Sequence, residues 1–394
     1  MQIVYVYGGC SPKKYKEYIE SKGLRVQQQA QKYSQLLMEG FVANGVRVDA
    51  VSSRPINRAV DSRIIFKSEK DTECGINYNY VGFVNYSFFR KLTVFVNVFF
   101  KTLFIKTEKE SAVICDALNI SASFGALFAA KLRGKKAVGI VTDVPCHRPN
   151  NAKIPLSEKI NLWLMKHFDS YLLLTEQMND IVNPKRRPYV VLEGHSDISM
   201  KDIANHLEDK YSKKVCFYAG TLRRIYGIEN LVKGFLAANI PNTELHIYGE
   251  GDFRKELEQL AEKHESVKYM GILPNAEIVQ AELKATLLVN PRPTHEEYTK
   301  YSFPSKNMEY MASGTPILTT KLPGMPKEYY DFVFLLEEET ENGVCEALKN
   351  ILSKPSAELH EKGREAKEFV MEKKNNCVQA KKVLEMLCKK NTLE

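Results

Sequence analysis

Short apolar strands alternate with helical segments from the first residues of the chain, and this alternation limits the folds that the chain can adopt. Residues 3–7 are β-branched and aromatic, residues 25–44 carry apolar side chains at helical spacing, and residues 46–52 form a second strand-like run. A strand, a helix and a strand in this order form a βαβ unit with parallel strands. The pattern therefore predicts the α/β class with a doubly wound parallel sheet.

The alternation resumes in the second half of the chain, where Lys214–Ala219 and residues 244–248 are strand-like and Ile228–Ala238 is helical. A chain of 394 residues is too long for one typical hydrophobic core. We therefore expect two Rossmann-like domains joined by a linker near residues 194–213. The predicted bounds are residues 1–195 for the first domain, 214–370 for the second, and 371–394 for a C-terminal helix.

The composition excludes several other classes of protein. The eight cysteines include no C-x-x-C pair and no histidine at metal-ligand spacing, so they predict reduced thiols and no metal site. The first residues, MQIVYVYGG, are too short and too rich in tyrosine for a signal sequence. No run of 18 uncharged apolar residues occurs. We expect a cytoplasmic protein.

The positive charge is concentrated in the first half of the chain. Residues 1–200 contain 28 Lys and Arg against 18 Asp and Glu, whereas residues 201–394 contain 28 against 30. This asymmetry predicts that only the first half meets an anionic surface. Within it, residues 86–106 are aromatic and aliphatic with interspersed cations, which suits either the inner face of a membrane or a buried helix of the first domain.

The segment 287–320 contains the most informative chemistry. Leu287–Asn290 and Ile317–Thr320 are strand-like, and residues 302–313 between them are predicted to be a short helix with Pro304 in its first turn. The helix start would present free amides, the hydroxyls of Ser302 and Ser305, and the Lys306 cation, a combination that suits a phosphate. Glu309 lies one turn further along, where a carboxylate can bind ribose. The alternative is a capped α/β helix with a solvent-facing glutamate.

The sequence FPSKNMEYMASGTPILTT resembles the donor-binding segment of retaining GT-B glycosyltransferases of the family 4 type. Glu309 matches the second of that family's two glutamates, which binds the ribose, whereas Tyr301 replaces the first. The F-P-S-K variant is similar to that of capsule and surface-polysaccharide transferases. The resemblance implies the GT-B fold, with two facing Rossmann-like domains, parallel sheets and an interdomain cleft. It also implies that the C-terminal helix of residues 371–394 packs back on the first domain.

The resemblance also implies a donor site around the first strand of the second domain. The family carries an Arg and a Lys there, but this chain has Thr221 and Tyr226 in those positions. Charge for the diphosphate would then come from other cations of the surrounding loops. The predicted donor-binding residues are Gly8, Gly9, Gly220, Thr221, Arg224, Ile272, Arg292, Tyr301, Ser302, Phe303, Pro304, Ser305 and Glu309, with Ile272 at the nucleobase.

Asp143 follows the strand of residues 137–142, at the sheet edge where α/β proteins place functional groups. In the family that the chain resembles, a His or Asp near this point lies beside the acceptor and the donor sugar, which implies an acceptor-side role for Asp143. His147 is a second candidate, and a plain turn-capping role for Asp143 is the alternative. The predicted catalytic residues are Asp143, Lys306 and Arg223.

These features together predict a retaining hexosyl- or N-acetylhexosaminyltransferase. It would move a sugar from a nucleoside-diphosphate sugar, in particular a UDP-sugar, to a glycan or lipid-linked acceptor in surface polysaccharide synthesis. We expect no cofactor, no metal and no nucleic-acid partner. Two alternatives stay open: a GT-B sugar-nucleotide epimerase, which would act without an acceptor, and a non-enzymatic protein that binds membrane surfaces through residues 86–106.

Overall fold

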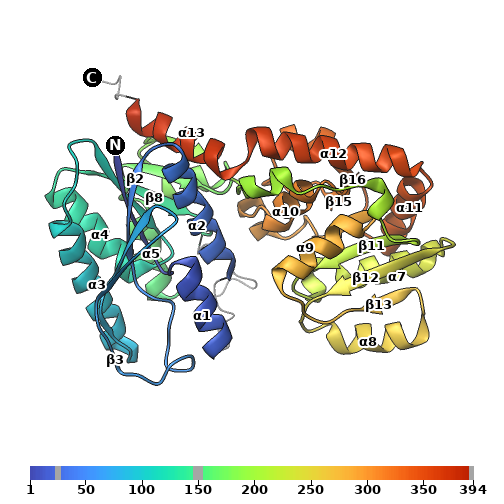
Figure 1. Ribbon diagram of the computed structural model, residues 1–394, viewed down its shortest axis with the longest axis horizontal. Helices are drawn as coiled ribbons and strands as arrows, with labels where there is room; N and C mark the ends of the chain where they lie inside the picture. Colours follow the sequence, from blue (N-terminus) through green and yellow to red (C-terminus); the bar gives the residue numbers. More distant parts are fainter. Residues whose placement is uncertain (23–27, 145–153, 390–394) are drawn as a thin grey trace. The chain divides into compact units, whose positions relative to one another are not determined.

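The computed structural model describes residues 1–22, 28–144 and 154–389 (Figure 1). The chain forms two compact units. Unit 1 comprises Met1–His195 together with Asn376–Glu394, and unit 2 comprises Ser196–Asn375. The last helix of the chain therefore belongs to the same unit as the first strand.

Unit 1 is built on a sheet with the strand order β10-β9-β8-β7-β1-β2-β5-β4. All neighbouring strands in it are parallel except β4, which pairs antiparallel with β5. A small antiparallel pair, β3 (Ile65–Phe66) with β6 (Phe83–Val84), lies outside it. The sheet strands are β1 (Gln2–Tyr7), β2 (Arg47–Ser52), β4 (Glu69–Glu73), β5 (Ile76–Tyr80), β7 (Ser111–Asp116), β8 (Lys136–Val141), β9 (Ser170–Leu173) and β10 (Tyr189–Val191).

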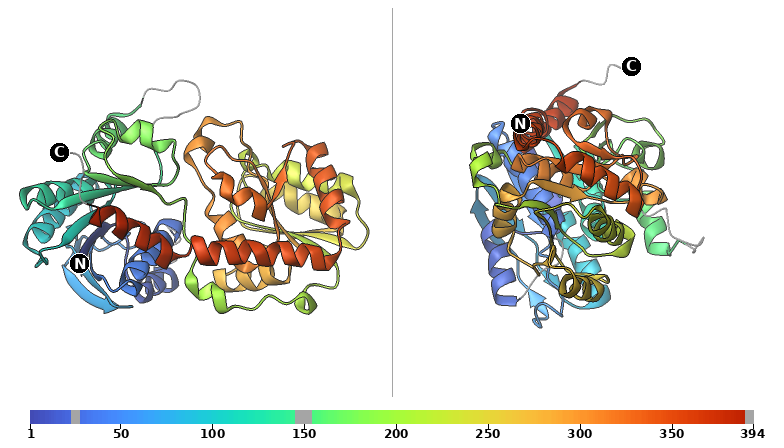
Figure 2. Two further views of the ribbon diagram at one scale, coloured as in Figure 1. Left: turned by 90° about the horizontal axis from the view of Figure 1, so that it is seen from above. Right: turned by 90° about the vertical axis from the view of Figure 1, so that its right-hand side faces the viewer.

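Helices cover both faces of this sheet, as a doubly wound fold requires (Figure 1). Helix α3 packs against α4 on one face, and α13 packs against α2 on the other (Figures 1 and 2). The helices of unit 1 are α1 (Pro12–Lys22), α2 (Gln28–Ala43), α3 (Ser87–Phe104), α4 (Ile120–Leu132), α5 (Leu156–Met165), α6 (Met178–Val182) and α13 (Asn376–Cys388).

Unit 2 is a second Rossmann-like unit with an all-parallel sheet in the order β13-β12-β11-β14-β15-β16. Its strands are β11 (Lys214–Ala219), β12 (Thr243–Tyr248), β13 (Val267–Tyr269), β14 (Leu287–Asn290), β15 (Ile317–Thr320) and β16 (Phe334–Leu336). Its α-helices are α7 (Ile228–Ala238), α8 (Arg254–Lys263), α9 (Asn275–Lys284), α10 (Ser305–Ser313), α11 (Glu341–Leu352) and α12 (Ser356–Lys373). Five short 3₁₀ turns complete the unit: Ile198–Asp202, Leu207–Asp209, Arg224–Tyr226, Glu297–Tyr301 and Lys327–Phe332.

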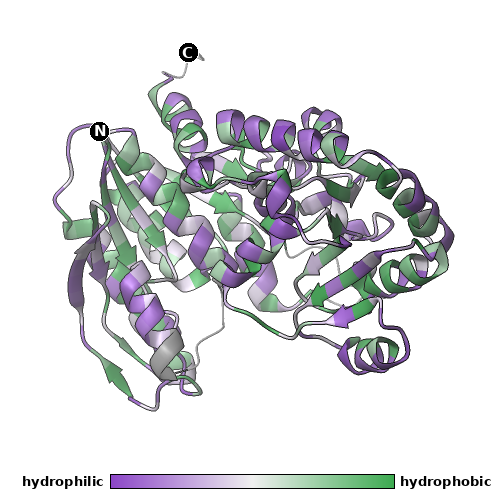
Figure 3. Cartoon of the chain, turned by 45° about the vertical axis from the view of Figure 1, so that its right-hand side comes forward, coloured by the Kyte–Doolittle hydropathy of each residue, from purple (hydrophilic) through white to green (hydrophobic). Residues whose placement is uncertain are grey.

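The inner strands of each sheet form its core because helices shield them from water on both sides. Every residue of β1 and of β14 is buried, and much of each sheet carries hydrophobic colouring in Figure 3. Such strands appear in the sequence as short continuous apolar runs. This is why their positions could be predicted closely.

Residues 54–80 are irregular and polar in sequence, which predicts a loop-rich insertion. That prediction is wrong, because this segment contains β4 and β5 of the main sheet. Strand β5 has the sequence INYNY, whose asparagines make it look polar. Its tyrosines are nevertheless buried: the Tyr78 hydroxyl donates to Gln35 at 2.8 Å, and the Tyr80 hydroxyl accepts from the Ser11 amide at 2.9 Å. Three further elements, α1, β6 and β16, were not predicted.

The close contact between α3 and α4 depends on a glycine and can be tested there. Replacing a helical glycine by alanine usually stabilises a helix by about 0.5–1 kcal/mol. A Cβ atom at Gly125, however, would lie 2.6 Å from the Phe95 carbonyl oxygen and 3.0 Å from the Phe99 nitrogen. We therefore expect Gly125→Ala to destabilise unit 1 by about 1–3 kcal/mol, measured by calorimetry as a melting temperature several degrees lower.

Ser121→Ala on the same helix is the control, because Ser121 is only partly buried. We expect its melting temperature to stay close to that of the original chain. An unchanged or higher melting temperature for Gly125→Ala would contradict the proposed packing.

Candidate functional site

Helix α10 begins at the carboxyl edge of the unit 2 sheet, later than predicted. The helix starts at Ser305, Pro304 is its N-cap residue, and no side chain caps its first amides. The first amides of a helix have no carbonyl partner within the helix and carry a partial positive charge. Ser302 lies outside the helix, in extended conformation, so the predicted common face of Ser302 and Ser305 does not form in α10.

Helix α10 is fixed to the sheet by buried polar contacts. The Asn307 side chain accepts from Asn290 of β14 at 2.6 Å, and the Tyr310 hydroxyl accepts from the Ala219 amide of β11 at 2.9 Å. Gly314, with a φ of +78°, ends the helix in the left-handed conformation that favours glycine. The helix start is therefore held beside the carboxyl ends of β11 and β14.

Lys306 extends from the first turn of α10 to Tyr218 of β11. Its ammonium donates to the Tyr218 hydroxyl at 2.9 Å and lies 4.2 Å from the centre of the Tyr218 ring. The pKa of Lys306 is lowered from 10.5 to about 7, mainly by desolvation. Glu309 and Glu282 oppose this shift, and nearby Arg292 contributes to it. The side chain is a cation whose charge costs free energy until an anion arrives.

Two glycines make room for this lysine. A Cβ atom at Gly220, whose φ is +156°, would lie 1.5 Å from the Lys306 Nζ atom. A Cβ atom at Gly249, whose φ is +133°, would lie 1.8 Å from the Gly220 carbonyl oxygen. The loops after β11 and β12 can therefore approach each other closely only with glycine at both positions.

Two arginines share the ring of Tyr226, the residue that occupies the family's lysine position. The Arg292 guanidinium lies 5.2 Å from the centre of the Tyr226 ring and 5.1 Å from that of Tyr298. Arg223 lies 5.7 Å from the same Tyr226 ring. The Arg292 Nε atom and the Tyr298 hydroxyl are buried without a hydrogen-bond partner. Such groups are costly unless a ligand or water binds them.

We define the cation cluster as Arg223, Arg292 and Lys306. The other predicted donor residues have different surroundings. Glu309 is partly buried and interacts electrostatically with Lys306. Ile272 is half exposed after β13, and the Thr221 carbonyl accepts from the Tyr218 hydroxyl at 3.0 Å. Tyr301 is partly buried at the end of the turn before α10.

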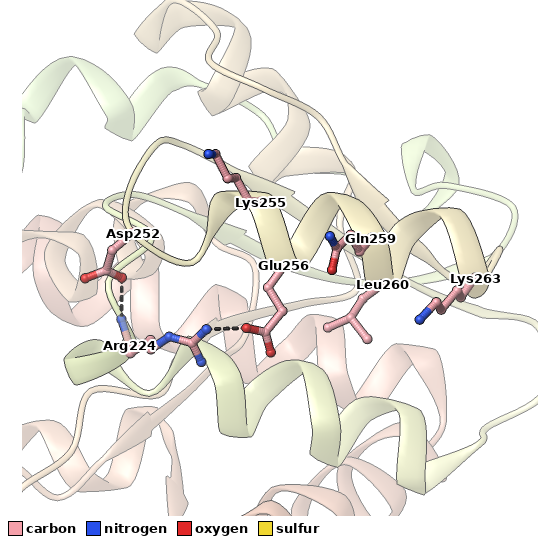
Figure 4. Close-up of a pocket in the computed structure, with 7 residues that line it drawn as sticks. All are labelled: Arg224, Asp252, Lys255, Glu256, Gln259, Leu260 and Lys263. Carbon is pink, nitrogen blue, oxygen red and sulfur yellow. Dashed lines mark hydrogen bonds and ion pairs between the residues drawn. The ribbon is translucent and has the colours of Figure 1, made fainter.

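Three predicted donor residues have structural partners instead. Arg224 projects toward α8, where its amide donates to Asp252 at 3.0 Å and its guanidinium pairs with Glu256 (Figure 4). The guanidinium also pairs with Glu229. Phe303 is buried against Tyr329, with ring centres 5.1 Å apart. Gly9 is buried in unit 1, where a Cβ atom would lie 2.2 Å from the Tyr7 ring.

In unit 1, Asp143 lies exposed just after β8, and Gly8 lies just after β1. Asp143 accepts from the Val144 amide at 2.8 Å, as the turn-capping alternative requires. Partial desolvation raises the pKa of Asp143, with a smaller contribution from Glu158, and the Val144 bond opposes the rise. His147 lies outside the described residues.

The sequence reasoning missed Asp116, which ends β7 at the same edge of the sheet. Burial raises the pKa of Asp116 to about 6, although its bond from the Leu118 amide opposes the shift. The available signal was its position at the end of a predicted strand, the same signal that selected Asp143. Among the residues that the structure describes, no group of three His, Cys, Asp or Glu side chains could hold a metal ion.

The comparisons with known proteins agree with this architecture. Residues 200–369 match the family model described as glycosyl transferases group 1. No curated protein matches the sequence. Sucrose-phosphate synthase from Thermosynechococcus elongatus has a similar structure, with a TM-score of 0.66 at 14% identity over 98% of this chain and 99% of that one.

Two further solved structures give the same result. Anabaena HepE in complex with UDP has a TM-score of 0.65 at 13% identity, over 98% of this chain and 99% of that one. The lipopolysaccharide outer core galactosyltransferase WaaB has a TM-score of 0.64 at 14% identity, with the same coverage. The fold is GT-B. The group 1 match over unit 2 and this fold support a glycosyltransferase.

Two lysines of unit 2 should titrate near neutral pH. Desolvation lowers the pKa of both Lys306 and Lys210 to about 7, but Lys210 donates to the Leu283 carbonyl and to Thr315 instead of lying in the cation cluster. We expect NMR of lysine-labelled protein to show two signals that titrate near pH 7, one lost in Lys306→Met and the other in Lys210→Met. If Lys306 titrates with the exposed lysines near pH 10, its described environment is wrong.

Proposed function

We propose that this GT-B protein is a retaining glycosyltransferase that moves a hexosyl or N-acetylhexosaminyl group from a UDP-sugar to a glycan or lipid-linked acceptor. The observation that carries the proposal is the cation cluster of Arg223, Arg292 and Lys306 beside the uncapped start of α10. Each cation rests on a tyrosine ring at the carboxyl edge of a parallel sheet, where α/β folds bind nucleotides.

The cation cluster suits a diphosphate leaving group. Departure of a nucleoside diphosphate develops negative charge on phosphate oxygens, and fixed cations and helix amides stabilise that charge. Arg292 has an unpartnered buried Nε atom that can donate to an oxygen. Lys306 gains a proton most readily when an anion is bound, because desolvation alone disfavours its charge. Binding of the diphosphate would therefore recruit the third positive charge.

Glu309 and Ile272 would bind the nucleoside. In the family that the sequence resembles, a glutamate in the position of Glu309 holds the ribose hydroxyls, and the backbone at the position of Ile272 meets the base. Glu309 lies one helical turn after Lys306 on α10, a separation that suits adjacent phosphate and ribose. UDP-containing structures among the similar folds, such as Anabaena HepE, support uridine as the base.

Retention means that the new bond forms on the face from which the diphosphate leaves, so that no protein nucleophile is needed. The chemical step then depends on stabilising the leaving group and on orienting the acceptor hydroxyl. Asp143 would orient the acceptor or the donor sugar, and its raised pKa fits a carboxylate in a partly desolvated place. We further propose a role in surface polysaccharide synthesis at the cytoplasmic face of the membrane, in keeping with the F-P-S-K variant.

Titration calorimetry with UDP tests the nucleotide site. We expect UDP to bind the original chain and Glu309→Ala to weaken the affinity by about 1–3 kcal/mol, because hydrogen bonds from ribose to a carboxylate would be lost. Glu358→Ala, on an exposed helical position of the same unit, is the matched control and should bind UDP unchanged. No binding of UDP or of any other nucleoside diphosphate would remove the proposed function.

The pH dependence of the same binding assigns the role of Lys306. Above its pKa of about 7 the free lysine is neutral, so that UDP must bind together with a proton and the affinity falls as the pH rises. The fall should disappear in Lys306→Met and persist in Lys210→Met. UDP itself becomes more anionic above about pH 6, which strengthens its binding to cations as the pH rises. The lysine variants are the proper reference because they keep this contribution of UDP.

Asp143→Asn should separate catalysis from donor binding. We expect turnover to fall at least tenfold while the UDP affinity stays unchanged, because the residue lies in unit 1 and the nucleotide residues in unit 2. The measurement is sugar transfer with a panel of nucleotide sugars, combined with calorimetry on the same samples. Full activity of Asp143→Asn would leave the residue with its turn-capping role alone.

A further inference from the structure

Helix α3 turns an apolar face toward solvent. Phe88 is 70% exposed, Phe100 50% and Phe104 76%, and Phe100 stacks on Phe104 with ring centres 6.1 Å apart. Phe89 and Leu92 are also exposed. None of the helices in the described parts of the chain is long and apolar enough to cross a bilayer. The exposed rings therefore need another explanation than a spanning segment.

Helix α3 is apolar on its buried side as well as on its exposed side. The buried stripe is Val94, Val98 and Thr102. Arg90 lies toward this side and donates to Asn85 at 3.1 Å and to the Arg54 carbonyl at 3.0 Å. Desolvation lowers the pKa of both Arg90 and Lys101. A surface helix normally turns a polar face outward, whereas the outer face of α3 carries aromatic rings beside Lys91 and Asn97.

Packing at several points holds α3 in this orientation. The Arg133 guanidinium donates to the Thr102 and Ile105 carbonyls at 2.9 Å each, which satisfies the end of the helix. Gly125 of α4 lets the α3 backbone approach closely at Phe95. The exposed face of α3 is thus a consequence of specific contacts on its other side.

The apolar surface continues from α3 onto α4 and α5. Helix α4 packs on α3 and contributes Leu132, which is 71% exposed; its Phe124 stacks on Trp163 of α5 at 5.7 Å. In unit 2 only Leu207, Ile225, Met270 and Ile272 are comparable exposed apolar residues. We define the aromatic band as Phe88, Phe89, Leu92, Phe100, Phe104, Phe124, Phe128, Leu132, Leu156, Ile160 and Trp163.

The charges around the aromatic band favour an anionic occupant. Neither α3 nor α4 contains an aspartate or a glutamate. Exposed lysines lie on or directly after these helices at Lys91, Lys106 and Lys131. Helix α5 adds one acid, Glu158, and one exposed lysine, Lys159. A second copy docked through the same face would bring two predominantly cationic surfaces together, which is unfavourable. Apolar rings flanked by lysines are instead the composition of helices that lie in a membrane interface.

We propose that the aromatic band binds the surface of an anionic lipid bilayer, with α3 lying in the interface and the rings of α3, α4 and α5 among the acyl chains. The inference rests on the proposed function in naming a lipid-linked acceptor as the substrate class, because an enzyme seated on the bilayer meets such an acceptor by diffusion in the plane. The rings supply the binding free energy, and the lysines select anionic lipid.

Trp163 provides a direct test, because it is the only tryptophan of the chain and is 50% exposed within the band. The full chain is mixed with vesicles of equal parts phosphatidylglycerol and phosphatidylcholine, without nucleotide. We expect a blue shift of tryptophan emission, quenching by bromine-labelled acyl chains, and sedimentation with the vesicles. Pure phosphatidylcholine should bind more weakly.

The variant Phe100→Ser/Phe104→Ser removes two stacked exposed rings and should lower the partition coefficient about tenfold or more. Leu207→Ser, at an exposed apolar residue of unit 2, is the matched control and should bind vesicles unchanged. Leu132→Ser/Leu156→Ser tests α4 and α5 independently. Melting curves establish that each variant is folded before it is measured.

Several outcomes would overturn the proposal. These are absence of quenching by the brominated lipid, unchanged binding by both double variants, and binding that is abolished by salt but insensitive to the phenylalanines. A dimer in solution that dissociates in Phe100→Ser/Phe104→Ser would make the band a contact between copies. Because no nucleotide is present, failure here leaves UDP binding intact, whereas failure of UDP binding leaves the vesicle result intact.

Discussion

The contact of the Lys306 ammonium with Tyr218 is the interaction on which the candidate site of unit 2 depends. It requires glycine at position 220, because any side chain there would occupy the place of the ammonium. It also requires α10 to be fixed to β11 and β14, which the buried bonds of Tyr310 and Asn307 achieve. The result is a desolvated lysine beside an uncapped helix start, so that two sources of positive potential act at one place.

Tyrosine rings take the place of charges in this site. The position at which the resembling family carries a lysine is Tyr226 here, and its ring supports Arg292 and Arg223 from the neighbouring loops. A cation on an aromatic face gains about 0.5–2 kcal/mol and loses rotational freedom. The charge needed for a diphosphate is thus supplied by side chains other than those in the family's usual positions, and the rings hold those side chains in place.

The sequence predicted the parts of the fold and site that depend on local patterns. Continuous apolar runs located β11, β14 and β15 to the residue, and the Pro304 and Gly314 signals located α10 within three residues. Strand β5 escaped prediction because its buried tyrosines alternate with asparagines. Arg223 and Arg224 could not be separated, since the partners that draw Arg224 toward α8 are fixed only by tertiary packing. The lowered pKa of Lys306 likewise depends on burial by distant residues.

Helix α3 illustrates the same limit in another form. The sequence of residues 86–106 suits a helix, but it does not say which stripe faces the protein, and here the stripe of Val94, Val98 and Thr102 does. Exposing aromatic side chains to water forgoes about 1.5–3 kcal/mol for each one that could have been buried. Turning the helix over would recover part of this free energy, but it would break the bonds of Arg90 and Arg133. An apolar face that is kept exposed at that cost is most simply explained if the acyl chains of a bilayer cover it.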